Sequence, residues 1–305
     1  MINFRYHMVS LAAVFLALAV GAVFGTTAAN GVASDVLSDS VSAAHKANKQ
    51  LRDTANELEE EASRKDDYIN ETAPALLSGT LTGRRIVVLT TPSGREHAGG
   101  VIEKIGLAGA AVTGPIDVRE AFFNPKNSLD LLALTRTVPA GTLPATGDGV
   151  RTASALLATV LLTPDPSGVQ TDDRRSVVLS AYARAQYLTV PERLDGPADA
   201  AVLVTGAAYV EEDSAERNAA IATMAAQFGG TGRTVVAGTG AAEGSVIEAV
   251  RGDDALAARI STVDGVAGVQ GQVVTALALV ERIVADRVGR YGTAAGADAL
   301  TPRRW

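Results

Sequence analysis

The chain has 305 residues, of which 47% are hydrophobic, 20% are charged and only 4% are aromatic, and its formal net charge is -7. It contains no cysteine, which excludes disulfide scaffolds, cysteine-ligated zinc, iron–sulfur clusters and thiol nucleophiles. The net negative charge argues against electrostatic binding of nucleic acid, and the shortage of aromatic residues argues against the aromatic girdles of a transmembrane β-barrel.

The first element in the chain is an uncharged apolar segment over residues 8–29. As a helix it would extend about 33 Å at about 1.5 Å per residue, which is enough to cross the hydrocarbon core of a membrane. Arg5 precedes it, so the positive-inside rule predicts a cytoplasmic N-terminus and an extracytoplasmic remainder. The alternative is a signal peptide cleaved after the small residues Thr27-Ala28-Ala29. The length of the apolar run favours an uncleaved anchor.

Small residues recur on one face of this segment at every fourth position. They are Ala13, Ala17, Gly21 and Gly25, and they end in a GxxxG pattern. Small side chains in this register let two helices approach closely in lipid, so the pattern predicts a helix-packing face on the span. The segment is rich in Ala and Gly throughout, and chance alone is the alternative explanation.

A charged, helix-favouring stalk follows over residues 35–72, and Pro74 and Gly79 are expected to end it. Apolar and small residues repeat with heptad spacing along it: Leu37, Ala44, Leu51 and Leu58 at d, and Val41, Asn48, Ala55 and Ala62 at a. Such a seam, with one Asn at an a position, favours a parallel dimer. The alternative is an amphipathic helix folded back on its own domain. We favour self-association, because a stalk next to an anchor has little else to pack on.

From residue 84 to residue 290, short apolar strands alternate with helical patterns. Strands are expected at 86–89, 110–116, 187–190, 200–204, 234–237 and 260–264, and helices at 95–107, 126–136, 148–162, 172–183, 212–228 and 270–287. This alternation predicts an α/β domain with a Rossmann-like, mostly parallel sheet. We therefore expect four parts: a membrane span or signal segment over 1–30, a helical stalk over 31–78, an extracytoplasmic α/β domain over 79–290 and a flexible tail over 291–305.

Residues that could support chemistry are sparse. Gly206, Gly238 and Gly240 follow strands but do not match a dinucleotide fingerprint, so turn glycines are favoured over a nucleotide site. Ser93 follows a strand without the glycine before it that a nucleophile elbow requires. The three histidines, His7, His45 and His97, stand in no catalytic motif, and the methionines and acidic residues form no ligand cluster that a metal site requires. The sequence therefore predicts no enzyme, no cofactor and no high-affinity metal site.

Several segments together resemble one known family. The opening YHMVSLAAVFLALAVGAVFG, the stalk, ISTVD at residues 260–264 and GRYGT at residues 289–293 are similar to the actinobacterial copper-transport outer-membrane protein family (MctB type). The resemblance covers nearly the whole chain in order, although the YGTG expected near the C-terminus ends in Ala294 here. It implies a pore-forming protein of the outer membrane that contributes to copper efflux and copper resistance, with copper ions as the transported species.

Two functions remain open from the sequence. The first is an oligomer, associated through the span and the stalk, that forms or supports a channel for copper efflux across the cell envelope. The second is an inner-membrane-anchored dimer that holds its α/β domain outside the cytoplasm as a scaffold or partner-binding module. The resemblance favours the first, and the order of span, stalk and domain favours the second. Since the chain lacks thiolates, copper in transit is expected to meet only weak ligands.

Overall fold

The computed structural model describes residues 4–139, 144, 146–162, 172–191, 194 and 196–303. They divide into two compact units, with the boundary between Lys65 and Asp66. A single helix, α1 (Phe4–Leu77), makes up the first unit and continues into the second. Pro74, which was expected to end the stalk helix, lies inside α1, three residues before its last residue, Leu77. The helix closes when the N–H of Ser78 donates to the carbonyl of Pro74 at 3.0 Å.

The second unit is built on a seven-stranded sheet in the order β3-β2-β1-β4-β5-β6-β7. The strands are β1 (Arg85–Thr90), β2 (Ala111–Val118), β3 (Leu188–Thr189), β4 (Ala200–Val204), β5 (Arg233–Ala237), β6 (Ile260–Val263) and β7 (Arg290–Tyr291). All neighbouring strands pair in parallel except β2 and β3, which are antiparallel. The predicted fold class, a mostly parallel α/β sheet preceded by an apolar helix, is confirmed.

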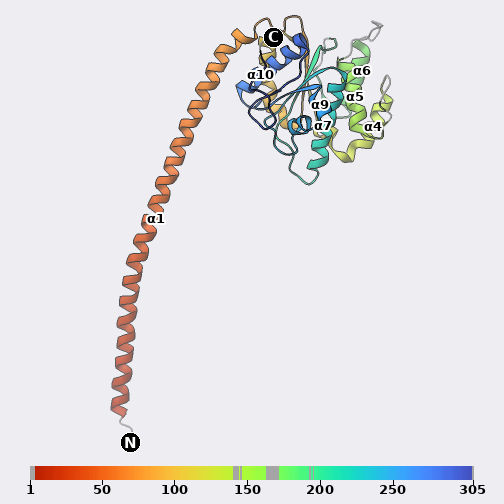
Figure 1. The fold of residues 1–305 in the computed structure, drawn as a ribbon. Helices are drawn as coiled ribbons and strands as arrows, with labels where there is room; N and C mark the ends of the chain where they lie inside the picture. The colour runs from red at the N-terminus through yellow and green to blue at the C-terminus, as the bar shows by residue number, and fades with distance from the viewer. Residues whose placement is uncertain are drawn as a thin grey trace. The chain divides into compact units, whose positions relative to one another are not determined.

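Helices connect the strands and cover both faces of the sheet, with α10 on one side and α5 and α7 on the other (Figure 1). They are α2 (Arg95–Leu107), α3 (Glu120–Phe123), α4 (Ser128–Thr137), α5 (Gly149–Leu162), α6 (Asp172–Arg184), α7 (Ser214–Thr231), α8 (Val246–Arg251), α9 (Asp254–Ala257) and α10 (Val269–Val280). Short turns of other helix types are η1 (Pro92–Gly94), η2 (Pro125–Asn127) and the π-helical η3 (Glu281–Ala285).

The sheet separates two hydrophobic cores, because successive side chains of a strand point to opposite faces. Val87 and Leu89 of β1 belong to the core that α5 and α7 cover. Ile86 and Val88 belong to the other core, which is covered by α2, α10 and the last turns of α1. Strands buried on both faces explain why β1 and β4 appear in the sequence as unbroken apolar runs.

The C-terminal segment differs from the flexible tail expected after Tyr291. The side chain of Arg290 contacts Asp298 at 2.6 Å, and the N–H of Gly292 donates to the carbonyl of Ala299 at 3.0 Å. These bonds fold the described residues 290–299 back onto β7 at the edge of the sheet. Arg290, which precedes the tail, holds Asp298 through its side chain and through its backbone carbonyl. The composition of the tail alone does not reveal these contacts.

Candidate functional site

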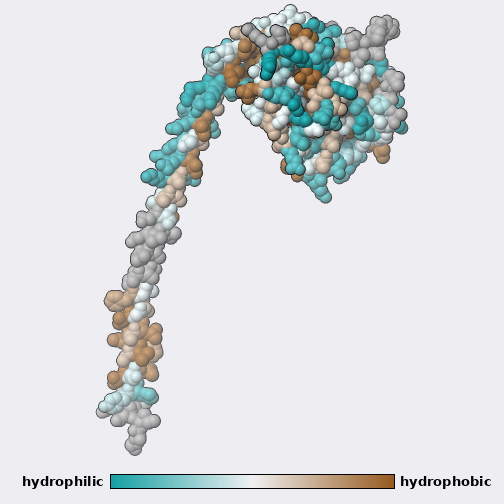
Figure 2. Space-filling view, in the orientation of Figure 1, coloured by the Kyte–Doolittle hydropathy of each residue, from teal (hydrophilic) through white to brown (hydrophobic). Residues whose placement is uncertain are grey.

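The N-terminal part of α1 is long and apolar enough to cross a membrane. The candidate span runs from Tyr6 to Thr26, with 21 residues, a mean hydropathy of 2.4 and no burial against the rest of the chain. It extends about 32 Å at about 1.5 Å per residue. Figure 2 shows apolar side chains gathered along this part of the helix, in contrast to the more polar stalk. A membrane anchor and an N-terminal signal sequence both meet this description.

The four predicted packing residues of the span lie uncovered on the helix. Ala13, Ala17, Gly21 and Gly25 are all exposed. A Cβ added at either glycine would meet no atom within 4 Å, so the backbone of α1 can be approached closely at these positions. In a single chain this face is available to lipid or to another helix.

The heptad seam of the stalk is uncovered as well. The side chains of Val41, Leu51 and Leu58 are 48%, 71% and 60% exposed. The remaining described seam residues are also exposed: Ala44, Asn48, Ala55 and Ala62. The side chain of Leu37 lies outside the described residues. Exposed leucines at regular heptad positions on a lone helix are apolar area without a partner in this chain.

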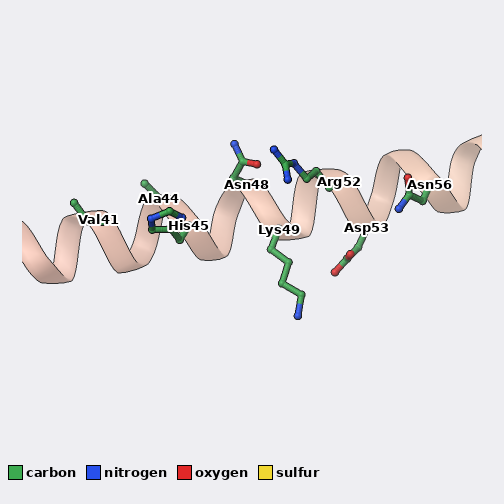
Figure 3. Close-up of a pocket in the computed structure, with 8 residues that line it drawn as sticks. All are labelled: Val41, Ala44, His45, Asn48, Lys49, Arg52, Asp53 and Asn56. Carbon is green, nitrogen blue, oxygen red and sulfur yellow. The ribbon is translucent and has the colours of Figure 1, made fainter.

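Charged and polar side chains flank the seam. A shallow hollow on the stalk is lined by Val41, Ala44, His45, Asn48, Lys49, Arg52, Asp53 and Asn56. Ala44, Asn48 and Arg52 project from one side of the helix, whereas Lys49 and Asp53 project from the other (Figure 3). Side chains that spread around one helix leave the hollow open to solvent, so it does not enclose a ligand.

The seam ends where α1 enters the second unit. Glu61 forms an exposed ion pair with Lys65 at 2.7 Å, and this hydrogen bond lowers the pKa of Glu61. Ile69 continues the heptad count in the sequence, but it packs against the core that contains Ala73 and Leu77. The unpartnered seam is therefore restricted to residues before Lys65.

The two exposed faces of the first unit point in different directions. In an α-helix each residue rotates by about 100° around the axis. On that count, the mean direction of the four small span residues differs from that of the eight seam residues by about 190°. Gly21 and Ala44, which represent the two faces, are about 140° apart. The structure thus brings each set together on a face of its own and does not bring the two sets together.

In the second unit, two segments that carry the family resemblance meet at the carboxyl end of β6. Asp264 ends the ISTVD segment, and its Oδ1 accepts hydrogen bonds from the N–H groups of Thr293 at 2.7 Å and Ala294 at 3.1 Å. Gly292 has a φ of +124°, and a Cβ there would collide with the Asp264 carboxylate. The glycine of the GRYGT segment is therefore required both by the backbone conformation and by the close approach of Asp264.

Arg251 at the end of α8 completes this joint. Its Nη2 lies 2.8 Å from Oδ2 of Asp264, and the two side chains are 4% and 2% exposed. The contact is an ion pair rather than an aligned hydrogen bond. The guanidinium also donates to the carbonyls of Tyr291 at 2.9 Å and Ala295 at 3.0 Å. We call Arg251, Asp264 and the backbone of residues 291–295 the β6 joint.

A cavity of about 180 Å³ lies beside the β6 joint. Asp66 of α1 lines it together with Asp264, Gln270 and Thr293. The Asp264 carboxylate is already engaged by Arg251 and two N–H groups, so it is not free to bind a metal ion. The β6 joint therefore has a structural role: it attaches the C-terminal segment to the sheet.

The glycine-rich loops occupy the place where doubly wound sheets bind nucleotides, at the carboxyl ends of β1 and β4. A Cβ on Gly206 would collide with the carbonyl of Ser93, and a Cβ on Gly94 would collide with that of Val204. The Ser93 hydroxyl accepts a hydrogen bond from the N–H of Gly206 at 3.2 Å. These glycines let two loops pack tightly together, and the packing fills the crevice with backbone.

The other candidate groups are dispersed in the structure. His97 is half-buried on α2, with its Nε2 3.4 Å from Oε1 of Glu96, whereas His7 and His45 are exposed on α1. Asp253 caps α9, where its carboxylate accepts hydrogen bonds from the N–H groups of Ala255 and Leu256. Within the described residues, no group of three or more His, Cys, Asp or Glu side chains could hold a metal ion.

The β6 joint was not predicted from the sequence. Two signals pointed to it: an aspartate directly after a buried strand and followed by glycine, and a second conspicuous segment containing Tyr291-Gly292-Thr293. Neither signal says that the two segments touch, because their contact depends on strand order and on Arg251 from a third element.

Comparisons with known proteins agree with the sequence resemblance. Residues 1–302 match the family model described as "Copper transport outer membrane protein, MctB". The chain is 31% identical over 316 residues to the copper transporters MctB of Mycobacterium tuberculosis and Mycobacterium bovis, with 99% of each chain covered. It is 30% identical over 329 residues to the Mycobacterium leprae protein of the same name, again with 99% of each chain covered. The family is one of transport proteins and not an enzyme class. With a match of this extent, the chain belongs to the copper transport outer membrane protein family, MctB.

Proposed function

We propose that several copies of this chain assemble through α1 and form, or support, a channel for copper ions in the cell envelope. The observation that carries the proposal is the pair of unpartnered faces on α1, one on the span and one on the stalk. Membership of the copper transport family supplies the transported species. The absence of thiolates fits an ion that passes through rather than one that is stored.

Assembly is needed because the described part of the chain has one helix that could cross a membrane. A single helix has no interior, so a pore requires several spans side by side. Copies anchored in one bilayer are held parallel and close together, which raises their effective concentration and favours stalk pairing. In a parallel pair, the charged e residues Arg52 and Glu59 would face Ala47 and Thr54 at g, so no like charges oppose pairing over residues 47–59. Glu61 at g would face Asp66 at e, and this like-charge pair disfavours continuing the pairing beyond Ala62.

The opposite directions of the two faces determine what kind of assembly is formed. Two straight helices that pair through the seam keep their small span residues turned away from each other. Each small-residue face is then free to contact a further copy, and alternating contacts build an assembly larger than a dimer. A dimer that used both faces at once would require α1 to twist by about half a turn between Gly25 and Leu37, where the backbone is continuous α-helix.

Disulfide cross-linking tests this assembly directly, because the chain has no cysteine of its own. The variant Ala44→Cys reports on the seam, and Gly21→Cys reports on the span. Each single variant is oxidised in native membranes and should give a covalent dimer. The double variant with both cysteines should give a ladder of tetramers and larger species. The matched control combines Ala44→Cys with Leu51→Cys, which share one face, and should stop at the dimer.

Each outcome has a distinct consequence. If neither single variant forms a dimer, self-association through α1 is refuted. If the Gly21→Cys, Ala44→Cys double variant stops at the dimer, the alternating arrangement is refuted. Channel function itself is tested by ion conductance of the purified protein in planar bilayers and by the copper sensitivity of a deletion strain. Absence of both effects would overturn the transport proposal.

The alternative function is an inner-membrane-anchored scaffold with an extracytoplasmic α/β domain. It is supported by the order of the chain, in which a candidate span and a helical stalk precede a folded α/β unit. N-terminal sequencing of the mature protein from separated envelope fractions distinguishes the two functions. An intact N-terminus in the inner membrane favours the scaffold, and a chain that begins at Asn30 in the outer membrane argues against it.

A further inference from the structure

The soft metal donors of this chain are few, which makes their positions informative. It has 3 methionines, 3 histidines and no cysteine. Met224 is fully buried in the core of the second unit, and His97 is half-buried beside Glu96. His45 stands exposed on the stalk. His7 and Met8 are neighbours in the chain, and both are exposed. Among the described residues, they are the exposed imidazole and the exposed thioether that lie next to each other.

These two side chains border one hollow at the start of the span. The hollow is lined by His7, Met8, Leu11, Ala12 and Phe15. Neighbouring residues on a helix diverge by about 100°, so His7 and Met8 stand on either side of the ridge formed by Leu11 and Phe15. The methionine side chain has three rotatable bonds, which let its sulfur turn toward the imidazole across this apolar ridge.

We propose that His7 and Met8 form a weak, exchangeable binding site for Cu(I) at the N-terminal mouth of the span. Thioether sulfur is a soft ligand that selects Cu(I), and imidazole nitrogen also suits copper. Apolar surroundings favour a monovalent ion over a divalent one, because desolvation of the higher charge costs more. The positive end of the helix dipole opposes any cation at this position, and this keeps the site weak.

A weak site at the mouth of a span suits transit rather than storage. One chain supplies two donors, and a second copy of the span would supply two more. Only the second, four-donor form rests on the proposed assembly. The ratio of bound Cu(I) to chain separates the two forms: one ion per chain for the two-donor site, and one ion per two chains for the shared site.

Methyl NMR of methionine provides the test, because three methionines give at most three signals. The full-length protein is labelled with 13C in the methionine methyl groups, placed in nanodiscs and titrated with Ag(I), a redox-inert stand-in for Cu(I). The variant Met8→Leu identifies the Met8 signal. That signal should shift with Ag(I), and the signal of the buried Met224 should stay in place. An unmoved Met8 signal would overturn the proposal.

Affinity is then measured with Cu(I) itself, in competition with a coloured Cu(I) chelator under anaerobic conditions. The variants His7→Gln and Met8→Leu should each weaken binding at least tenfold. The matched control His45→Gln removes an exposed histidine elsewhere on the same helix and should change affinity less than twofold. If His7→Gln has no effect, or if His45→Gln has the same effect, the His7–Met8 pair is not the site. Loss of cross-linking or conductance with unchanged Cu(I) binding would refute the assembly and leave this site standing.

Discussion

Replacement of Asp264 by asparagine tests the β6 joint most directly. Asparagine has nearly the same shape as aspartate, and its Oδ1 can still accept the hydrogen bonds from Thr293 and Ala294. What Asp264→Asn removes is the negative charge opposite Arg251. The guanidinium then stays buried, at 4% exposure, with no counter-charge at 2.8 Å.

The expected cost follows from the burial of this pair. Removing one partner of a buried ion pair costs about 3 to 5 kcal/mol, because the remaining charge is left uncompensated in a poorly solvated site. Asp298 offers a matched control, since it pairs with Arg290 in the same segment at 2.6 Å, with side chains 50% and 37% exposed. That carboxylate has a lowered pKa because Arg290 hydrogen-bonds to it, but an exposed pair contributes only about 0 to 1 kcal/mol.

Urea unfolding of the full chain, followed by circular dichroism, measures the difference. With a slope of about 3 kcal/mol per molar urea, Asp264→Asn should lower the midpoint of the second unit by about 1 to 1.7 M. Asp298→Asn should lower it by less than about 0.4 M. Equal shifts for the two variants would refute the argument that burial makes the Arg251 pair the important one.

Three further predictions concern other positions. Gly292→Ala should destabilise the second unit and speed hydrogen exchange in residues 290–299, because a Cβ would collide with Asp264; unchanged exchange would contradict this. Burial raises the pKa of Tyr182 to about 12, so this side chain should leave stability unaffected by pH below about pH 10 and should lower it by about 2 kcal/mol by pH 12. Alkaline unfolding curves of Tyr182→Phe should therefore fall less steeply than those of the unchanged chain, and equal slopes would show that Tyr182 is not responsible. Leu51→Glu should prevent seam cross-linking, whereas the same charge at Gln50, outside the seam, should not; equal cross-linking would show that the seam is not the contact.

Local sequence patterns predicted the parts of the fold that depend on burial along one segment. The run Ala200–Val204 is apolar at every position because both faces of the central strand β4 are covered, and its bounds were predicted to the residue. The span and the helical stalk followed from composition in the same way. The pattern could not show that they form a single helix, because a helix without breaks has no sequence mark that distinguishes it from two adjacent ones.

The parts that were missed depend on contacts between distant segments. The two-residue strand β7 has no periodicity, and its place is set by Arg251 and Asp264 from elsewhere in the chain. The glycines after β1 and β4 could be predicted as turn residues. Their tight packing against Ser93 and Val204 could not, since it follows from the strand order.

The last turns of α1 set a limit on how this protein can be cut. Ala73 and Leu77 are completely buried, and Asn70 accepts a hydrogen bond from the buried Lys104 ammonium at 2.7 Å. A soluble fragment that starts at Gly79 would therefore expose the apolar surface that Ala73 and Leu77 cover. It would also lack the amide of Asn70, to which the Lys104 ammonium donates a hydrogen bond. A protease that is to release the α/β unit in folded form has to cleave before Asp66. During synthesis, the last turns of α1, which cover part of one face of the sheet, leave the ribosome before β1 does. They are therefore present when the sheet begins to form.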